Sequence, residues 1–566
     1  MEEKMKALQI LVLCCLLLCG AAVLSAQTPQ WLWAVQAGGP TGGWGNYDAG
    51  TSIATDNQGN KYITGAFSDT VTFGSHTLTA SGLYDIFVAK MDPSGTWLWA
   101  VKAGGLRYAE AVGIAVDDVG NAWVTGSIRG TVTFGSHTLT AEGYNIDVFV
   151  AKLDPSGNWL WAVSAGGTDI NRGFCITPDG SGNAYVTGYF TGAATFGSQT
   201  LTASGDEFNK ELFVSKLDSN GNWLWTVSAG GLSDDIGFSI AVDGAGNIWV
   251  SGGFYGTVSF GSHTLTTSEG DYVLDIFVAK LDPSGNWLWA VQAGGSGIDM
   301  CFGFALDGSG DALLTGIFFS TATFGNHSLT AGEWDWNGDI FVAKMDTSGN
   351  WLWVVQAGGT QPDCAYGIAV DSAGNAYVTG QYMGEATFGS HTLAMCGGND
   401  LFAAKLDPSG NWLWAVKADG LDEDLGLGIA LDGAGNVYVF GIFNGKINFG
   451  NHALTAIGNM DIFITKLGSG TAVEDVLAPQ AVVRLHNAYP NPLVRGGSAL
   501  IKTEIPERST GILSIFNLRG QIVARHKLSP GTRQISFSGE GLPAGVYLYS
   551  LQCGDYRETR KLVLMK

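Results

Sequence analysis

The tripeptide Trp-Leu-Trp recurs along this chain at nearly constant spacing, with copies at Trp31, Trp97, Trp159, Trp223, Trp287, Trp351 and Trp412. The intervals between successive copies are 66, 62, 64, 64, 64 and 61 residues. A fixed period means that one supersecondary unit has been copied, and such a unit buries its apolar faces only against its neighbours. The repeat therefore constrains the architecture strongly and the ligand weakly.

Each repeat contains short runs rich in Val, Ile, Phe, Trp and Tyr, which is typical of β-strands. Two turns within it share the pattern Asp-x-x-Gly-Asn, for example at 371–375 and 407–411. Aspartate bonds the backbone two residues on, and glycine accepts the left-handed conformation that a short hairpin needs. We therefore predict two hairpins per repeat, which form a four-stranded antiparallel sheet, with a flap or small extra hairpin between them.

Strands such as 275–279 and 287–291 are apolar on both faces, so both faces should be covered. Sheets stacked radially satisfy this requirement, which favours a β-propeller over a linear solenoid with its shorter rungs.

The phase of the repeat predicts how the ring closes. The first repeat element is the strand at 31–33 and the last is the strand at 461–466, so the last repeat lacks its fourth strand. Pairing these two strands removes two open sheet edges. We predict an all-β chain with a seven-bladed β-propeller at residues 27–467, closed in a 1+3 arrangement by the N-terminal strand.

The segment from Asp371 to Gly380, Asp-x-x-Gly-Asn-x-Tyr-Val-Thr-Gly, resembles the bacterial SBBP-type β-propeller repeats. The resemblance covers about Trp31 to Lys466. It implies the fold but little about function, because members of that group are mostly uncharacterised surface proteins.

Residues 1–26 carry two lysines and then an apolar stretch that ends in Leu24-Ser25-Ala26, which predicts a secretory signal peptide. A lipoprotein would use Cys19, but Leu18 stands where a small residue is wanted. The stretch is short for a transmembrane helix, and we predict no membrane span in the mature chain.

The cysteines beyond the signal peptide are scattered and occupy no equivalent repeat positions, which predicts no disulfide framework. A bridge between the two cysteines of adjacent blades stays open as an alternative to isolated thiols. These cysteines are Cys175, Cys301, Cys364, Cys396 and Cys553, and the adjacent pair is Cys301 and Cys364.

A shift in charge marks a second domain. Residues 27–478 contain 15 Lys and Arg against 44 Asp and Glu, whereas residues 479–566 contain 12 against 5. The net charges of −29 and +7 indicate separate roles, and the acidic first part argues against nucleic-acid binding. A linker at 468–485 joins the two parts.

We predict that the second domain, at 486–566, is a small Ig-like β-sandwich. Its strands are expected near 499–505, 511–517, 522–527, 532–537, 545–553 and 557–564. It resembles the C-terminal sorting domain of the type IX (Por) secretion system over its whole length. The residues that carry this resemblance are Tyr489, Pro490, Asn491, Pro492, Gly545, Tyr547 and Lys561.

The resemblance implies a Gram-negative host of Bacteroidetes type, the type IX machinery as a partner, and export across the outer membrane to the cell surface or medium. In that family the domain is commonly removed at the surface, while the passenger is released or attached to lipopolysaccharide. An ordinary Ig-like adhesion module is the alternative.

A histidine recurs once per repeat, at His76, His137, His263, His327, His391 and His452, with Gln199 in the remaining copy. Equivalent positions on a ring lie too far apart to share one metal ion. A structural hydrogen bond within each blade is the interpretation that we favour. The turn aspartates likewise supply too few ligands for a calcium loop.

A different set of aspartates stands five residues before the inner-strand Ile or its equivalent: Asp48, Asp235, Asp299, Asp363 and Asp424. The two exceptions are Ala109 and Asn171. Inner strands line a propeller's channel, so one hypothesis is an acidic ring at one mouth that binds a ligand or a cation such as Ca²⁺. The other hypothesis, which the recurrence at one repeat position favours, is that each aspartate caps its own strand or ties neighbouring blades together.

Loops expected on the same face carry aromatic residues, which beside carboxylates suit sugars or basic peptides unless they pack under the loops. These aromatics are Trp44, Tyr47, Tyr84, Tyr108, Tyr144, Phe208, Tyr272, Trp334 and Trp336.

No nucleophile elbow, phosphate loop or His-Glu-x-x-His motif occurs in the sequence. We therefore expect a secreted, non-enzymatic binding protein that recognises a glycan or a protein and needs no cofactor. A carbohydrate-active hydrolase or lyase, using acidic residues such as Asp234–Asp235 or Asp422–Asp424, and a purely structural envelope component are the alternatives.

Overall fold

In the computed structural model the chain divides into two compact units, Met1–Thr471 and Ala472–Lys566. The structure describes residues 28–40, 48–205, 208–268, 273–332, 337–468, 484–485, 488, 491–494, 497–504, 511–528, 534–553 and 556–565. Every element of regular secondary structure within these ranges is a β-strand, so the all-β prediction is confirmed. The predicted signal peptide and most of the linker lie outside the described residues.

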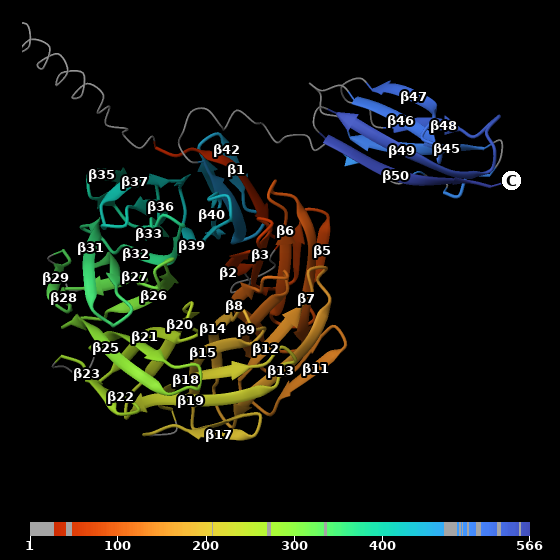
Figure 1. Cartoon of the computed structure of the whole chain (residues 1–566). Helices are drawn as coiled ribbons and strands as arrows, with labels where there is room; N and C mark the ends of the chain where they lie inside the picture. The colour runs from red at the N-terminus through yellow and green to blue at the C-terminus, as the bar shows by residue number, and fades with distance from the viewer. Residues whose placement is uncertain are drawn as a thin grey trace, which may run out of the picture. The chain divides into compact units, whose positions relative to one another are not determined.

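The first unit repeats one four-stranded antiparallel sheet, and Figure 1 shows these sheets arranged around a common centre. From the innermost strand outward, they are sheet 1, β2 (Ala49–Thr55), β3 (Lys61–Phe67), β6 (Asp85–Met91) and β7 (Trp97–Gly105); sheet 2, β8 (Ala109–Val116), β9 (Ala122–Ile128), β12 (Asp147–Leu153) and β13 (Trp159–Gly167); sheet 3, β14 (Arg172–Pro178), β15 (Ala184–Thr191), β18 (Lys210–Leu217) and β19 (Trp223–Gly231); sheet 4, β20 (Asp235–Val242), β21 (Ile248–Tyr255), β24 (Leu274–Leu281) and β25 (Trp287–Gly295); sheet 5, β26 (Met300–Leu306), β27 (Ala312–Phe319), β30 (Gly338–Met345) and β31 (Trp351–Gly359); sheet 6, β32 (Cys364–Val370), β33 (Ala376–Tyr382), β36 (Asp400–Leu406) and β37 (Trp412–Lys417); and sheet 7, β39 (Asp424–Leu431), β40 (Val437–Phe443), β43 (Asp461–Leu467) and β1 (Trp31–Ala37).

The residues between the two hairpins of each repeat form a small extra hairpin, as predicted. These hairpins are β4 (Thr70–Phe73) and β5 (His76–Thr79), β10 (Gly130–Phe134) and β11 (His137–Ala141), β16 (Ala193–Phe196) and β17 (Gln199–Thr202), β22 (Thr257–Phe260) and β23 (His263–Thr266), β28 (Thr321–Phe324) and β29 (His327–Thr330), β34 (Glu385–Phe388) and β35 (His391–Ala394), and β41 (Lys446–Phe449) and β42 (His452–Thr455). Most pair with the outer strand of the preceding sheet, as β10 does with β7, and β41 pairs with the short β38 (Asp419–Gly420).

The N-terminal strand β1 is hydrogen-bonded to β43 near the end of the unit. The pairing is antiparallel, with Ala34 opposite Thr465, and Thr465 Oγ1 also donates to Trp33 O at 2.7 Å. The innermost strand of sheet 7, β39, lies against β2 of sheet 1, just as neighbouring innermost strands contact one another along the chain.

The sheets hold together by packing of apolar side chains between them. The third strand of each sheet is buried on both faces, as the seven fully enclosed residues of β6 illustrate. Phe73 contacts Phe87 and the edge of Trp97, each with ring centroids 5.0 Å apart, and the other sheets repeat this cluster. Burying one such ring contributes about 1.5–3 kcal/mol, which explains why both faces of these strands are apolar.

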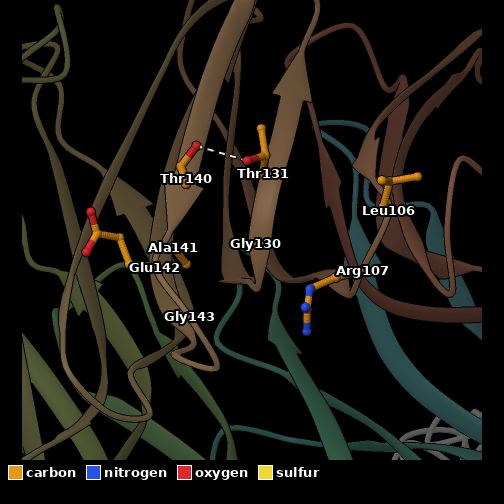
Figure 2. Close-up of a pocket in the computed structure, with 8 residues that line it drawn as sticks. All are labelled: Leu106, Arg107, Gly130, Thr131, Thr140, Ala141, Glu142 and Gly143. Carbon is orange, nitrogen blue, oxygen red and sulfur yellow. Dashed lines mark hydrogen bonds between the residues drawn. The ribbon is translucent and has the colours of Figure 1, made fainter.

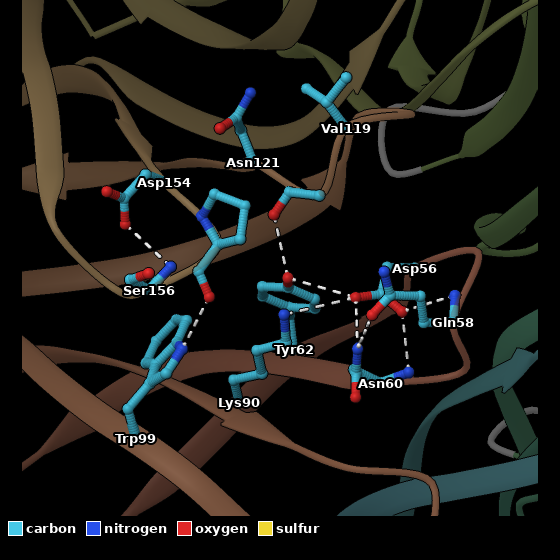
Figure 3. A network of polar contacts seen from close by, with 12 residues as sticks. Asp56, Gln58, Asn60, Tyr62, Lys90, Trp99, Val119, Asn121, Asp154 and Ser156 are labelled. Carbon is cyan, nitrogen blue, oxygen red and sulfur yellow. Dashed lines mark hydrogen bonds and ion pairs between the residues drawn. The ribbon is translucent and has the colours of Figure 1, made fainter. Parts of the chain in front are cut away.

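The hairpin turns are closed by side-chain bonds to their aspartates (Figure 3). Asp56 Oδ1 accepts from the backbone N–H groups of Gln58 and Asn60, and its Oδ2 accepts from Asn60 Nδ2 at 2.7 Å. Lys90 Nζ lies 3.4 Å from the same carboxylate, and Trp99 Nε1 reaches Pro155 O on the next sheet at 3.0 Å. Hairpin chemistry therefore accounts for these aspartates.

The second unit contains two sheets. One consists of β44 (Arg484–Leu485), β45 (Ser498–Glu504) and β48 (Gln534–Ser538); the other of β47 (Ile522–Leu528), β46 (Gly511–Asn517), β49 (Gly545–Cys553) and β50 (Tyr556–Leu564). The predicted strands are present with small shifts at their ends, and their core contains Leu513, Ile515 and Tyr549.

Candidate functional site

Each sheet of the first unit has two unlike ends. At one end both hairpins close through the aspartate turns. At the other end, one loop leads to the next sheet and another leads from the small hairpin into the third strand. Bridges join these two kinds of loop, pairing Tyr84 with Tyr108 and Ile146 with Ile170. We call the two ends the turn face and the loop face.

The five aspartates predicted as an acidic ring do lie at the loop face, but they are enclosed. Asp48, Asp235, Asp299, Asp363 and Asp424 are all 0% exposed. The prediction of an open acidic mouth is therefore wrong. Each side chain lies between the start of its own inner strand and the outer strand of the preceding sheet, so solvent does not reach it.

Their contacts agree with the alternative in which they cap strands and tie neighbouring sheets. Asp299 Oδ1 accepts from Phe319 N at 3.0 Å, and Asp363 Oδ1 accepts from Met383 N at 2.9 Å. Burial raises the pKa of Asp299 and Asp363 to about 7. Burial likewise raises the pKa of Asp48, Asp235 and Asp424 to about 8.

A second set of buried acids faces the first and was missed from the sequence. A Cβ on Gly294 would collide with Asp275 Oδ1 and lie 3.0 Å from Asp299 Oδ2, so both oxygens gather at one glycine. Among the described residues, both oxygens are buried without a hydrogen-bond partner. Asp339 and Asp363 repeat the arrangement. The signal was the acidic residue at the first or second position of each third strand: Asp85, Asp147, Glu211, Asp275, Asp339, Asp400 and Asp461.

Two sheets depart from this pattern. At the start of sheet 2, Ala109 replaces the aspartate, and Asp85 of the preceding sheet pairs instead with Lys102 at 2.8 Å. At the start of sheet 3, Asn171 is fully buried and its Nδ2 donates to Ile146 O at 3.1 Å. These two loop ends therefore keep one of the two acids each: Asp85, which is buried, and Asp147, which is half-buried.

The same two loop ends hold every arginine of residues 27–478, namely Arg107, Arg129 and Arg172. Arg107 lies in the loop before sheet 2, Arg129 just follows β9, and Arg172 begins β14. This grouping was missed from the sequence, although the distribution of arginine alone contained the signal.

A surface pocket of about 580 Å³ opens beside Arg107, within the range that small ligands occupy. Figure 2 shows Arg107 and Glu142 on opposite sides of the paired ends of β10 and β11, where Thr131 and Thr140 are hydrogen-bonded at 3.1 Å. Leu106 and Gly143 also line the pocket.

The predicted aromatic residues have mixed outcomes. Tyr144 and Phe208 are 78% and 74% exposed, whereas Tyr84 and Tyr108 contact each other edge to face. The rest of that set, Trp44, Tyr47, Tyr272, Trp334 and Trp336, lies outside the described residues.

Among the residues that the structure describes, no group of three or more His, Cys, Asp or Glu side chains is placed to hold a metal ion. Gln199, the repeat equivalent of the histidines, accepts a hydrogen bond from Thr226 N at 2.7 Å, which is a contact within its own repeat. Cys301 and Cys364 are buried free thiols, so the bridge between adjacent blades is not formed.

In the second unit, hydrogen bonds join sorting residues from the beginning and the end of the domain. Asn491 Nδ2 donates to Lys561 O at 2.8 Å, and Asn491 Oδ1 accepts from Val563 N at 2.9 Å, which ties the opening segment to β50. Tyr547 is buried and donates to Pro543 O at 2.8 Å. Pro492 and Gly545 are described as well, whereas Tyr489 and Pro490 lie outside the described residues.

Comparison with known families identifies both parts. The secretion system C-terminal sorting domain matches residues 487–565, and the β-propeller repeat of SBBP type matches residues 352–381. The chain carries an SBBP β-propeller repeat and a Por secretion sorting domain. The sorting domain indicates the type IX secretion machinery as a partner, and secretion to the cell surface or extracellular space. No helix among the described residues is long and apolar enough to cross a membrane.

Two curated proteins are similar to this chain. An uncharacterized WD repeat-containing protein of Acanthamoeba polyphaga mimivirus is 26% identical over 514 residues, covering 74% of this chain and 36% of that protein. The regulatory protein FlaEY of Caulobacter vibrioides is 24% identical over 187 residues, covering 31% of this chain and 20% of that protein. The chain thus spans only about a third and a fifth of their lengths.

Solved structures resemble the chain only distantly. A fungal alcohol oxidase of the AA5 family with copper is 13% identical, covers 79% of this chain and 96% of its own, and has a TM-score of 0.31. Dimeric latent PorU from Porphyromonas gingivalis is 9% identical, covers 96% of this chain and 34% of its own, and has a TM-score of 0.14. Neither likeness supports an inference about function.

Proposed function

We propose that the first unit is a seven-bladed β-propeller, closed by β1, that recognises an extracellular glycan or protein through its loop face. The closure is supported by the pairing of β1 with β43 and by the contact of β39 with β2. The placement outside the cell is supported by the sorting domain.

The observation that carries the binding role is the distribution of exposed large apolar side chains. Among the described residues of the first unit, Val119 is such a side chain in a turn of the turn face. Five less exposed ones, at 43–48%, are the second residues of outer strands near that face: Leu98, Leu160, Leu224, Leu288 and Leu352. The loop face has nine: Leu83, Leu106, Tyr144, Ile170, Phe208, Leu232, Met395, Leu421 and Ile457. Apolar groups gathered on one face of a secreted protein are typical of a surface that contacts another molecule.

We propose no catalytic role and no cofactor. The acids predicted for hydrolysis do not form an open pair, because Asp235 and Asp424 are buried and Asp234 is ion-paired with Lys210. Each enclosed carboxyl pair offers four side-chain oxygens, fewer than the six to eight oxygens that Ca²⁺ takes. We therefore infer that these pairs are neutralised by protons.

A glycan array probed with the full chain, with calcium and with chelator, tests this function. Glycan binding should be independent of calcium and should weaken in Leu232→Ser or Phe208→Ser. The matched control is Val119→Ser, which removes an equally exposed apolar side chain from the turn face. Binding that weakens in the control and not in the loop variants would contradict the assignment to the loop face.

A further inference from the structure

The loop ends of sheets 2 and 3 differ in charge from the rest of a strongly acidic unit. Residues 27–478 have a net charge of −29, yet their only arginines stand here, where two of the repeated buried aspartates are missing. The missing aspartates remove negative charge and the arginines add positive charge. Both changes therefore make the electrostatic potential at these loop ends more positive. This end of the molecule is therefore suited to an anion, unlike its counterparts.

Two guanidinium groups converge on one exposed aromatic side chain. The Arg107 and Arg129 guanidinium carbons lie 5.5 and 5.0 Å from the ring centroid of Tyr144, which is 78% exposed. The loop that carries Tyr144 is fixed by Asn145 Nδ2, which donates to Gly167 O at 2.8 Å. Stacking against one ring holds both cations at the surface without neutralising them.

None of the three arginines forms an ion pair with a carboxylate in the described part of the chain, whereas several lysines of the unit do. Arg172 begins β14, and a Cβ on the adjacent Gly173 would meet Thr125 and Gly126 of β9, a short distance along the strand from Arg129. Uncommitted guanidinium groups are the side chains best shaped for bidentate contact with a carboxylate.

The residues that line the pocket beside Arg107 indicate which other groups the ligand carries. Its walls supply the hydroxyls of Thr131 and Thr140, the carboxylate of Glu142 and the apolar Leu106. Hydroxyls and one acid suit the hydroxyl groups of a sugar ring. Glu142, with the acidity of the unit as a whole, disfavours densely charged chains such as acidic peptides or sulfated polymers.

We propose that the loop ends of sheets 2 and 3 form a subsite for a saccharide in which single uronic-acid units alternate with neutral sugars. The uronate carboxylate lies against Arg107 and Arg129, and the neighbouring sugar occupies the pocket. This subsite rests on the proposed binding function and names the ligand class for it.

The test is calorimetric titration of the full chain with a hyaluronan tetrasaccharide, which alternates glucuronate with N-acetylglucosamine. Arg107→Gln and Arg129→Gln should each weaken binding by about tenfold or more, as expected for loss of a charge-assisted hydrogen bond. Lys446→Gln is the matched control, because Lys446 is an exposed cation at the position of Thr131 in another repeat, and its binding should stay unchanged. Thermal melting of each variant verifies that it folds.

Three results would overturn the subsite: no hyaluronan binding by the unaltered chain, equal binding by the arginine variants, or equally strong binding of poly-glutamate, which would indicate an acidic peptide. The neutral chitotetraose should bind at least tenfold more weakly than hyaluronan, by the same charge-assisted contact. If neutral glycans on the array bind, and this binding weakens in Leu232→Ser or Phe208→Ser, while hyaluronan does not bind, only the subsite fails. If no ligand responds to any loop substitution, the proposed function fails with it.

Discussion

The loop ends of the repeated sheets are of two kinds, although the strands of all the sheets are paired in the same way. At sheets 1, 4, 5, 6 and 7 an enclosed aspartate faces a second buried acid, as Asp299 faces Asp275. At sheets 2 and 3 the first aspartate is absent and arginines stand nearby. The strand pairings are the same in both groups. The fold therefore does not require the paired acids.

The enclosed acids also contrast with the turn aspartates. Burial pushes the pKa of Asp243 upward, but bonds from Asn247 and Lys280 outweigh it and lower the pKa to about 2. Asp299 pairs with no cation among the described residues, and burial raises its pKa to about 7. The same side chain is thus held charged at one end of a sheet and protonated at the other.

The largest expected effect is a loss of stability as pH rises from 5 to 7. The unfolded chain has released these protons above the ordinary aspartate pKa, whereas the folded chain retains them up to about pH 7–8, so folding binds protons in this range. The contribution is fully present below pH 3.8 and is lost as pH rises through the folded pKa. We expect the free energy of unfolding to fall by at least about 3 kcal/mol, measured by urea denaturation.

The matched variant is Asp299→Asn with Asp363→Asn, which keeps the acceptors for the two backbone N–H groups and should reduce this pH dependence, because Asp48, Asp235 and Asp424 still contribute. Lys61, whose pKa burial lowers to about 7, acts with the opposite sign above that pH, so the comparison stops there. A stability that rises between pH 5 and 7 in the unaltered chain would refute the assignment of protons to these pairs.

A substitution that makes sheet 3 like the others should have the next largest effect. Asn171→Asp places a second carboxyl beside Asp147, whose pKa burial and Glu142 already raise to about 6. We expect a loss of about 1–3 kcal/mol at pH 8, because the new charge is buried without a partner, and a smaller loss at pH 5. Thermal melting at both pH values measures this; equal losses would mean that the lost Asn171 hydrogen bonds, rather than the charge, decide the outcome.

Removing a cation from the turn face should destabilise the fold less, and this loss of stability should not depend on pH. Lys280→Met breaks the 3.0 Å ion pair with Asp243, which retains its bonds from Asn247, so we expect a loss of about 1–2 kcal/mol at pH 7. Denaturation at pH 5 and 7 should give the same difference from the unaltered chain. A pH-dependent difference would show that the two faces are not electrostatically independent.

The smallest expected effect on stability is that of Arg129→Gln. Its side chain is partly exposed and makes no ion pair among the described residues, so the free energy of unfolding should change by less than about 1 kcal/mol. A larger loss would mean that the stacking on Tyr144 stabilises the fold and is not reserved for a ligand.

The parts of the structure that follow from local chemistry were predictable. Turn patterns such as 371–375 placed the hairpins, and the phase of the repeat anticipated the pairing of β1 with β43. The environment of Asp299 was not predictable, because its burial depends on the outer strand of a different sheet, where Gly294 leaves room for two carboxyls. The convergence of Arg107 and Arg129 on Tyr144 likewise joins three loops whose relative positions no local pattern encodes.

Hydrogen–deuterium exchange of the full chain, with and without the hyaluronan tetrasaccharide, compares both kinds of loop end in one experiment. We expect slower exchange on binding in residues 105–109, 129–131 and 141–146, and no change in the equivalent loops at 294–299 and 358–363. Protection of the latter loops, or of none, would contradict the claim that sheets 2 and 3 carry the ligand site.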